Sequence, residues 1–198
     1  MPGAAPRGQA RTAQLPCFRA PCRSGEMVAA VRSCGVFISY RRTDTGPYAR
    51  LVQVRLGEHL PGTPVFMDLD SIEAGVDFAG AITAGLDACC VLVALIGPRW
   101  LTATDDEGRR RLDNPDDYVR LEIRTALQRG LRVIPVLVDG ARMPGPQQLH
   151  ADLGKLARLN HLEISYDRCE YDESRLVAVI RKVLARSEGI APAASAVS

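Results

Sequence analysis

Short apolar runs alternate with helical patterns along most of the chain, and this alternation constrains the fold more than any other feature. Residues 91–96 are apolar throughout, and residues 131–138 are apolar except for Arg132. Continuous apolar strands are typical of parallel sheets, which are covered by helices on both faces. Because parallel strands are joined by right-handed crossovers, we expect an α/β sandwich of three layers. The number of apolar runs predicts a flavodoxin-like arrangement with a five-stranded parallel sheet.

The expected elements follow from the spacing of apolar residues. Strands are expected at 34–40, 63–67, 91–96, 131–138 and 162–165, and helices at 48–60, 77–88, 116–129 and 174–186. In the second helix, Phe78, Ile82 and Leu86 are spaced by four and share one face. Asp116 or Asp117 is the expected N-cap of the third helix.

Ligands of such sheets bind beyond the carboxyl ends of the strands, where the strand order reverses. The loops of interest therefore begin at Ser39, Asp68, Gly97 and Asp139. The charged stretch 102–117 is expected to be a mobile loop whose charges face water.

The length of 198 residues suits one domain with two tails. We expect a disordered basic tail at 1–33, a domain at 34–186 and a second disordered tail at 187–198, with Met27 as an alternative start. The first 33 residues carry five arginines and one glutamate, a charge of +4, so the rest of the chain carries −2 of the total of +2. The expected domain is therefore not basic, which argues against a nucleic-acid partner.

The six cysteines form no CxxC pair, so we expect no zinc or other metal site. Cys89 and Cys90 lie in an apolar run, where a free cysteine behaves as a small hydrophobic residue. Free thiols favour a reducing, cytoplasmic setting. The longest apolar run, 88–97, is too short for a bilayer span of about 20 residues, so no membrane association is expected.

Four blocks of sequence, in order, resemble TIR domains. They are FISYRR at 37–42, VFMD at 65–68 with the following loop LDSIEAG at 69–75, VLVALIGPRW at 91–100 and DYVRLEI at 117–123. The resemblance covers about residues 34–186. It is closest to bacterial TIR proteins and to the animal TIR enzyme of axon degeneration, and weaker for adaptor TIR domains of immune receptors.

The resemblance implies a set of site residues. Glu122 corresponds to the catalytic glutamate of enzymatic TIR domains, and the loop after Met67 corresponds to their BB loop. The implied substrate-binding residues are Tyr40, Arg41, Arg42, Asp68, Glu73, Trp100 and Tyr118. The implied self-association loop contains Asp70, Ile72, Gly75 and Val76. NAD⁺ is the implied substrate, no separate cofactor is implied, and the implied protein partners are other TIR domains.

The side-chain inventory agrees with cleavage of the nicotinamide–ribose bond. The sequence lacks GxGxxG, P-loop, GxSxG and HExxH motifs, and its three histidines fall outside the expected ligand loops. Nicotinamide leaves NAD⁺ as a neutral group and needs no protonation, so one carboxylate near the ribose suffices. Arginines can hold the diphosphate, and an aromatic ring can stack on nicotinamide.

Each assignment has a structural alternative. Glu122 lies at the shoulder of the stripe formed by Val119, Ile123 and Ala126, but it could be a solvated helix residue. Arg41 and Arg42 could bind phosphate or ribose, or form a surface pair with Asp44 or Asp68. Tyr40 could line the pocket or end its strand, and Trp100 could cover the pocket or act as a buried anchor.

Three functions remain open on the sequence. The first is hydrolysis of NAD⁺ to nicotinamide and ADP-ribose or cyclic ADP-ribose, in signalling or defence. The second is a non-catalytic module that signals by TIR–TIR contact, and the third is nucleotide binding without cleavage. Glu122 and the string Tyr40-Arg41-Arg42 favour the first.

Overall fold

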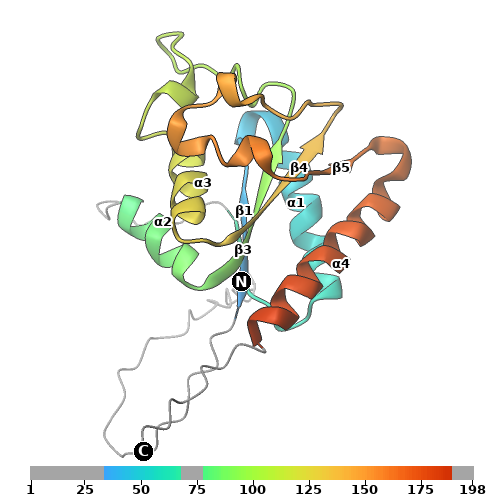
Figure 1. Cartoon of the computed structure of the whole chain (residues 1–198). Coiled ribbons are helices and arrows are strands. Elements are labelled where there is room, and N and C mark those ends of the chain that lie inside the picture. The colour runs from blue at the N-terminus through green and yellow to red at the C-terminus, as the bar shows by residue number, and fades with distance from the viewer. Residues whose placement is uncertain (1–33, 68–77, 189–198) are drawn as a thin grey trace, which may run out of the picture. The chain divides into compact units, whose positions relative to one another are not determined.

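All strands of the sheet run parallel, in the order β2-β1-β3-β4-β5, which confirms the expected flavodoxin-like fold (Figure 1). The computed structural model describes residues 34–67 and 78–188. The strands are β1 (Gly35–Ser39), β2 (Val65–Met67), β3 (Cys89–Ile96), β4 (Arg132–Val138) and β5 (Leu162–Ile164). The helices are α1 (Arg42–His59), α2 (Phe78–Asp87), α3 (Tyr118–Gln128) and α4 (Cys169–Glu188). The expected tail at 1–33 lies outside the described residues.

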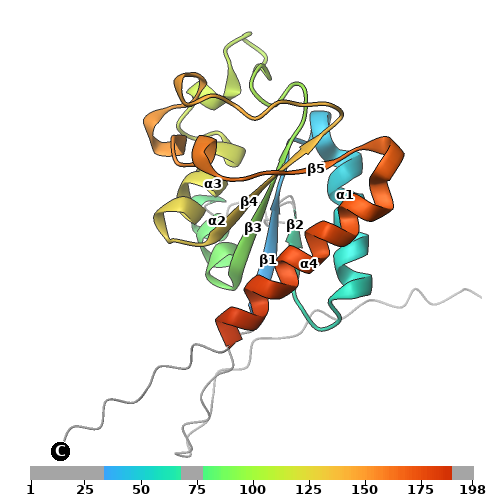
Figure 2. The same ribbon diagram turned by 45° about the vertical axis from the view of Figure 1, so that its right-hand side comes forward.

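Side chains that alternate along each strand serve two separate cores. Val36 and Ile38 of β1 pack with residues of α1 and α4, whereas Phe37 between them packs with α2 and α3. Figure 2 shows α1 and α4 on one side of the sheet and α2 and α3 on the other. On the second side, Ile82 and Leu86 are buried as the spacing of four predicted, while the side chain of Phe78 is not described.

Two helices begin earlier than the apolar spacing predicted. α1 starts at Arg42, and the prediction missed its first turn because the residues there are polar and give no apolar signal. Thr45 interrupts it with φ −124° and ψ 15°, so the first turn and the rest of α1 meet at a kink. α4 starts at Cys169 and ends at Glu188, so the helix continues into the expected C-terminal tail. No helix within 34–67 and 78–188 is long and apolar enough to cross a membrane.

Short 3₁₀ turns occupy the segments that gave no clear pattern. They are η2 (Arg111–Asp113), η3 (Pro146–Gln148), η4 (Ala151–Leu153), η5 (Leu156–Arg158) and η6 (Tyr166–Arg168). Leu153 and Leu156 from these turns are fully buried and extend the core on the α2/α3 side.

Cys34 and Cys90 form a disulfide, which corrects the expectation that the cysteines of the apolar run are free. Their Cα atoms are 5.2 Å apart. Gly35 pairs with Cys89 and Val36 with Val91, so an irregularity in the β1–β3 ladder leaves Cys90 beside Cys34. Cys89 remains a buried thiol, and burial raises its pKa to about 12. Because two cysteines are paired, cysteine content no longer argues for a reducing compartment.

Candidate active site

The strand order reverses between β1 and β3, and the carboxyl ends of these two strands define the candidate site. β1 leads into α1 on one face of the sheet, whereas the chain after β3 reaches α3 on the other face. Parallel sheets of this order bind ligands in the crevice beyond that point. The candidate site therefore includes the residues after β1 and the first turns of α3.

Glu122 lies in the second turn of α3 and is nearly buried, with 7% of its surface exposed. Val119, Ile123 and Ala126 pack into the core, so Glu122 stands at the edge of the buried stripe, as its helical position predicted. Ionisable side chains are rarely buried without a partner or a function. This burial is incompatible with the alternative of a solvated helix residue.

Tyr118 opens α3 one turn before Glu122. Tyr118 is 52% exposed, and the spacing of four places it on the same side of the helix as Glu122. An aromatic side chain that reaches solvent can stack on a flat ligand.

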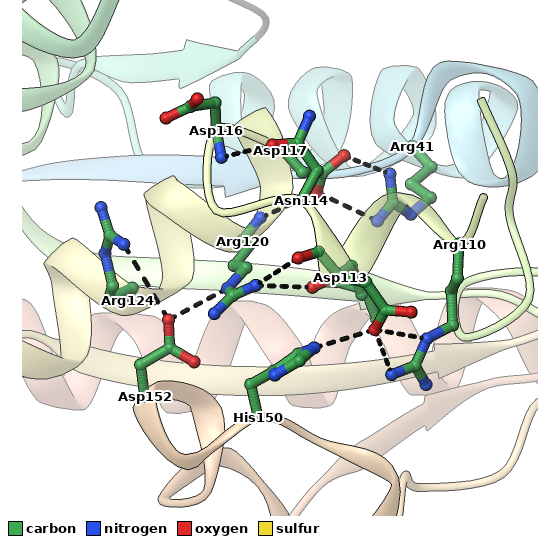
Figure 3. Close-up of polar contacts among 11 residues, drawn as sticks. Arg41, Arg110, Asp113, Asn114, Asp116, Asp117, Arg120, Arg124, His150 and Asp152 are labelled. Atoms are coloured by element: carbon green, nitrogen blue, oxygen red, sulfur yellow. Dashed lines mark hydrogen bonds and ion pairs between the residues drawn. The ribbon is translucent and has the colours of Figure 1, made fainter. Parts of the chain in front are cut away.

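Asp117 is the N-cap of α3, one of the two residues that the sequence predicted for this position. Its carboxylate accepts a hydrogen bond from the backbone N–H of Arg120 at 3.1 Å. The same carboxylate binds Arg41, with Nη1 to Oδ2 at 3.0 Å and Nη2 to Oδ1 at 3.1 Å. Arg111 adds an ion pair at 3.3 Å. Figure 3 shows Arg41 and Asp117 facing each other in this arrangement.

Arg41 is therefore buried in an ion pair rather than directed into solvent. Its Nε also donates to the backbone oxygen of Trp100 at 3.3 Å. The sequence named Asp44 and Asp68 as possible partners; in the structure the described partner is Asp117, 76 positions away. Asp44 instead accepts the backbone N–H of Arg99 at 3.1 Å. The Arg41 guanidinium already makes three protein contacts, so it is poorly placed for the phosphate contact that the sequence predicted.

Trp100 is only 1% exposed and belongs to the core on the α2/α3 side. The structure thus favours a buried anchor after β3 over a residue that covers a ligand. Tyr40 is half-buried and packs against the other core, beside α1 and α4. Arg42 is exposed and is the first residue of α1. Of the string after β1, Arg42 is thus the cation that faces solvent.

The segment between β3 and α3 has a defined structure, contrary to the expected mobile loop. Thr104 and Arg110 form an antiparallel bridge, and Leu112 is 1% exposed in the core. Apolar periodicity cannot reveal the structure of residues 102–117, because Leu112 is the only leucine that this stretch contributes to the core.

Asp113 in this segment contacts His150 from the segment after β4. The distance from His150 Nε2 to Asp113 Oδ1 is 2.8 Å, and Arg110 binds the same carboxylate (Figure 3). The hydrogen bonds from Arg110 and then His150 lower the pKa of Asp113 to about 2. His150 was expected outside the ligand loops, yet it lies on the segment that follows β4. All three side chains are partly exposed, and they tie two loops together.

Arg120 makes the corresponding link from α3. Its Nε binds Asp152 at 3.0 Å, and its Nη1 donates to the backbone oxygens of Leu112 and Asp113 at 3.0 and 3.1 Å. Both ends of the segment 112–117 are therefore fastened to α3. The sequence did not predict these contacts, because the partners of Arg120 lie 7, 8 and 32 positions away along the chain.

A further contact at this edge joins α1 to the end of β4. The Tyr48 hydroxyl donates to Asp139, whose φ of 51° is left-handed. The hydrogen bond to Asp139 and then burial raise the pKa of Tyr48 to about 12. Asp139 begins one of the expected ligand loops, but its partner was not foreseen.

The loop between β2 and α2 lies outside the described residues. It contains the expected residues Asp68, Asp70, Ile72, Glu73, Gly75 and Val76. Elsewhere in the described chain, no three His, Cys, Asp or Glu side chains come together as a metal site.

A sequence model of the TIR domain matches residues 36–184. NAD(+) hydrolase SARM1 of Danio rerio is 32% identical over 146 residues, covering 74% of this chain and 19% of that protein. NAD(+) hydrolase tir-1 of Caenorhabditis elegans is 26% identical over 157 residues, covering 79% of this chain and 15% of that protein. The chain thus spans less than a fifth of the length of these curated relatives.

Among solved structures, the TIR domains of the activated Roq1 resistosome that recognises the effector XopQ superpose with a TM-score of 0.53. That match covers 76% of this chain and 98% of the other, at 17% sequence identity. Identity this low supports a shared fold and nothing further.

Proposed function

The chain belongs to the TIR-domain family, and on that premise we propose that it is an NAD⁺ glycohydrolase whose catalytic residue is Glu122. The observation that carries the proposal is the burial of Glu122 on α3, near the point where the strand order reverses. The two curated relatives described above both carry the name NAD(+) hydrolase, which supports the proposal. The products are nicotinamide and either ADP-ribose or cyclic ADP-ribose.

The chemistry needs one negative charge and no metal or bound cofactor. When the bond between C1′ and the pyridinium nitrogen breaks, its electron pair neutralises the departing nicotinamide and leaves an oxocarbenium-like ribose. A carboxylate fixed beside C1′ stabilises that positive charge before water or the adenine ring attacks. Burial strengthens the effect, because the carboxylate acts in a medium of lower dielectric constant than water.

The exposed groups near the site supply the remaining contacts of the proposal. Tyr118 is proposed to stack on the nicotinamide ring and Arg42 to bind the diphosphate, and the exposure of both residues supports these roles. Tyr40 borders the strand end, and Asp68 and Glu73 complete the proposed set from the loop after β2. Arg41 and Trp100 support the site from inside the protein.

Self-association through the loop after β2 is the second part of the proposal. Asp70, Ile72, Gly75 and Val76 are proposed to contact a neighbouring TIR domain and to close the site. A non-catalytic role in TIR–TIR signalling is the alternative, and it requires no turnover at all.

Nicotinamide release by the purified protein is the deciding assay. Wild-type protein should release nicotinamide from NAD⁺, and Glu122→Gln should reduce the rate on the order of 10²-fold or more, since charge is lost at nearly constant volume. Glu163→Gln is the matched control, because Glu163 is an exposed carboxylate on β5. A folded Glu122→Gln protein with wild-type turnover would show that the assignment is wrong, and an inactive wild-type protein would favour the signalling module.

A further inference from the structure

Arg41 connects two helices that lie on opposite faces of the sheet. Its backbone begins α1, because its carbonyl oxygen accepts the N–H groups of Asp44 and Thr45 at 2.9 and 2.8 Å. Its side chain binds the N-cap of α3 through two parallel hydrogen bonds to Asp117. One residue at the end of β1 thus fixes the starts of both helices.

The ion pair is isolated from water. The Arg41 and Asp117 side chains are 4% and 2% exposed. The planar guanidinium matches both carboxylate oxygens at once, so the pair fixes orientation as well as distance. The additional bond from Nε to the Trp100 backbone ties the pair to the chain that leaves β3.

Glu122 follows the cap by five positions on the same helix, a rise of about 7.5 Å along the axis at 1.5 Å per residue. Packing of Val119, Ile123 and Ala126 sets the rotation of α3 about its axis. The link from Arg41 to Asp117 sets where the helix begins relative to the ends of β1 and β3. The rotation of α3 about its axis and the position of its first residue together determine where the Glu122 carboxylate lies.

We propose that Arg41 and Asp117 are positioning residues for Glu122, which they hold at a fixed height against the carboxyl edge of the sheet. This inference rests on the proposed NAD⁺ cleavage for its catalytic meaning. That Arg41 holds the start of α3 follows from the hydrogen bonds alone. This positioning role takes the place of the substrate contact that the sequence predicted for Arg41.

Arg41→Lys is the informative change, because it keeps the positive charge but cannot bind both carboxylate oxygens in the same plane. We expect kcat to fall about tenfold or more, since small displacements of a catalytic group slow the reaction strongly. KM should stay within about twofold, because no substrate contact is lost. Asp117→Asn, which keeps an acceptor for the cap but loses the charge, should change kcat in the same direction.

Arg55→Lys is the matched control for lost stability. Arg55 Nε binds the buried Glu173 carboxylate at 2.6 Å, and this pair joins α1 to α4 on the face away from α3. Both variants should unfold at lower temperature than wild type. Only Arg41→Lys should lose kcat when each is assayed fully folded.

Hydrogen exchange supplies a readout that does not depend on turnover. In Arg41→Lys the amides at the start of α3 should exchange about tenfold faster or more, while Arg55→Lys leaves them unchanged. Unchanged exchange at α3, a raised KM at wild-type kcat, or equal kcat losses in both variants would each overturn the proposal. If wild-type protein releases no nicotinamide, the proposed function fails, and the exchange comparison still decides whether Arg41 holds α3.

Discussion

The carboxylate of Asp44 occupies the space where a side chain on Gly97 would stand. A β-carbon at Gly97 would meet Asp44 Oδ2 at 2.5 Å and Thr45 Cγ2 at 2.6 Å. Gly97 follows β3 and Asp44 lies in the first turn of α1, so the close approach joins the ends of β1 and β3 at the candidate site. Asp44 also accepts the backbone N–H of Arg99, which prevents it from moving aside freely.

Gly97→Ala should therefore destabilise the protein by about 1–3 kcal/mol, the usual cost of overpacking a filled site. Gly57→Ala is the control, because nothing lies within 4 Å of a β-carbon there and α1 gains a better helix former. That control should be neutral or stabilising by up to about 1 kcal/mol. Urea unfolding of both variants measures the difference, and equal stabilities would contradict the close approach.

The Cys34–Cys90 disulfide predicts that stability depends on redox conditions. It closes a loop of 56 positions, and its reduction should cost about 2–4 kcal/mol of unfolding free energy. Thermal unfolding with and without reductant should differ for wild type and coincide for Cys34→Ser. Alkylation followed by mass spectrometry tests the pairing itself; a protein with both thiols free in air would refute it.

The bond between Tyr48 and Asp139 predicts a loss of stability at alkaline pH. The folded state raises the pKa of Tyr48 from 10.0 to about 12, so it favours the protonated hydroxyl. The resulting stabilisation is fully present below pH 10 and is lost as pH rises toward about 12. Tyr48→Phe should remove this part of the pH dependence of urea unfolding.

Asp139→Asn is the companion variant, because asparagine tolerates the left-handed backbone at φ 51° and still accepts a hydrogen bond. It removes the negative charge, so Tyr48 should ionise closer to its ordinary pKa. Absorbance titration of the tyrosines follows this directly, and an unchanged titration would exclude Asp139 as the cause.

Self-association predicts that turnover per protomer rises with protein concentration, since the assembled state is the competent one. Ile72→Asp in the loop after β2 should suppress assembly and turnover together. Val54→Asp, which changes an exposed apolar residue of α1, tests whether any loss of surface hydrophobicity has the same effect. Light scattering across a dilution series measures assembly. Constant turnover down to the monomer would show that one chain suffices.

The sequence alone determined the elements whose signals are local. Continuous apolar runs identified β3 and β4, and the spacing of Ile82 and Leu86 gave the buried face of α2. Asp117 was one of two foreseen caps for α3, and helical periodicity placed Glu122 at the edge of a buried stripe. Each depends on residues within a few positions of one another, where backbone geometry fixes which side chains share a face.

Only the tertiary structure decided which distant side chains meet. Arg41 binds Asp117 across 76 positions, Tyr48 binds Asp139 across 91, and Cys34 pairs with Cys90 across 56. A periodic sequence pattern cannot predict such pairs, because strand order and helix packing determine which distant residues meet. For Arg41, the sequence offered several acidic residues as equally plausible partners. For Arg41 the physical reason is burial: a charged group that the fold removes from water must pair with a partner that the fold supplies, here Asp117.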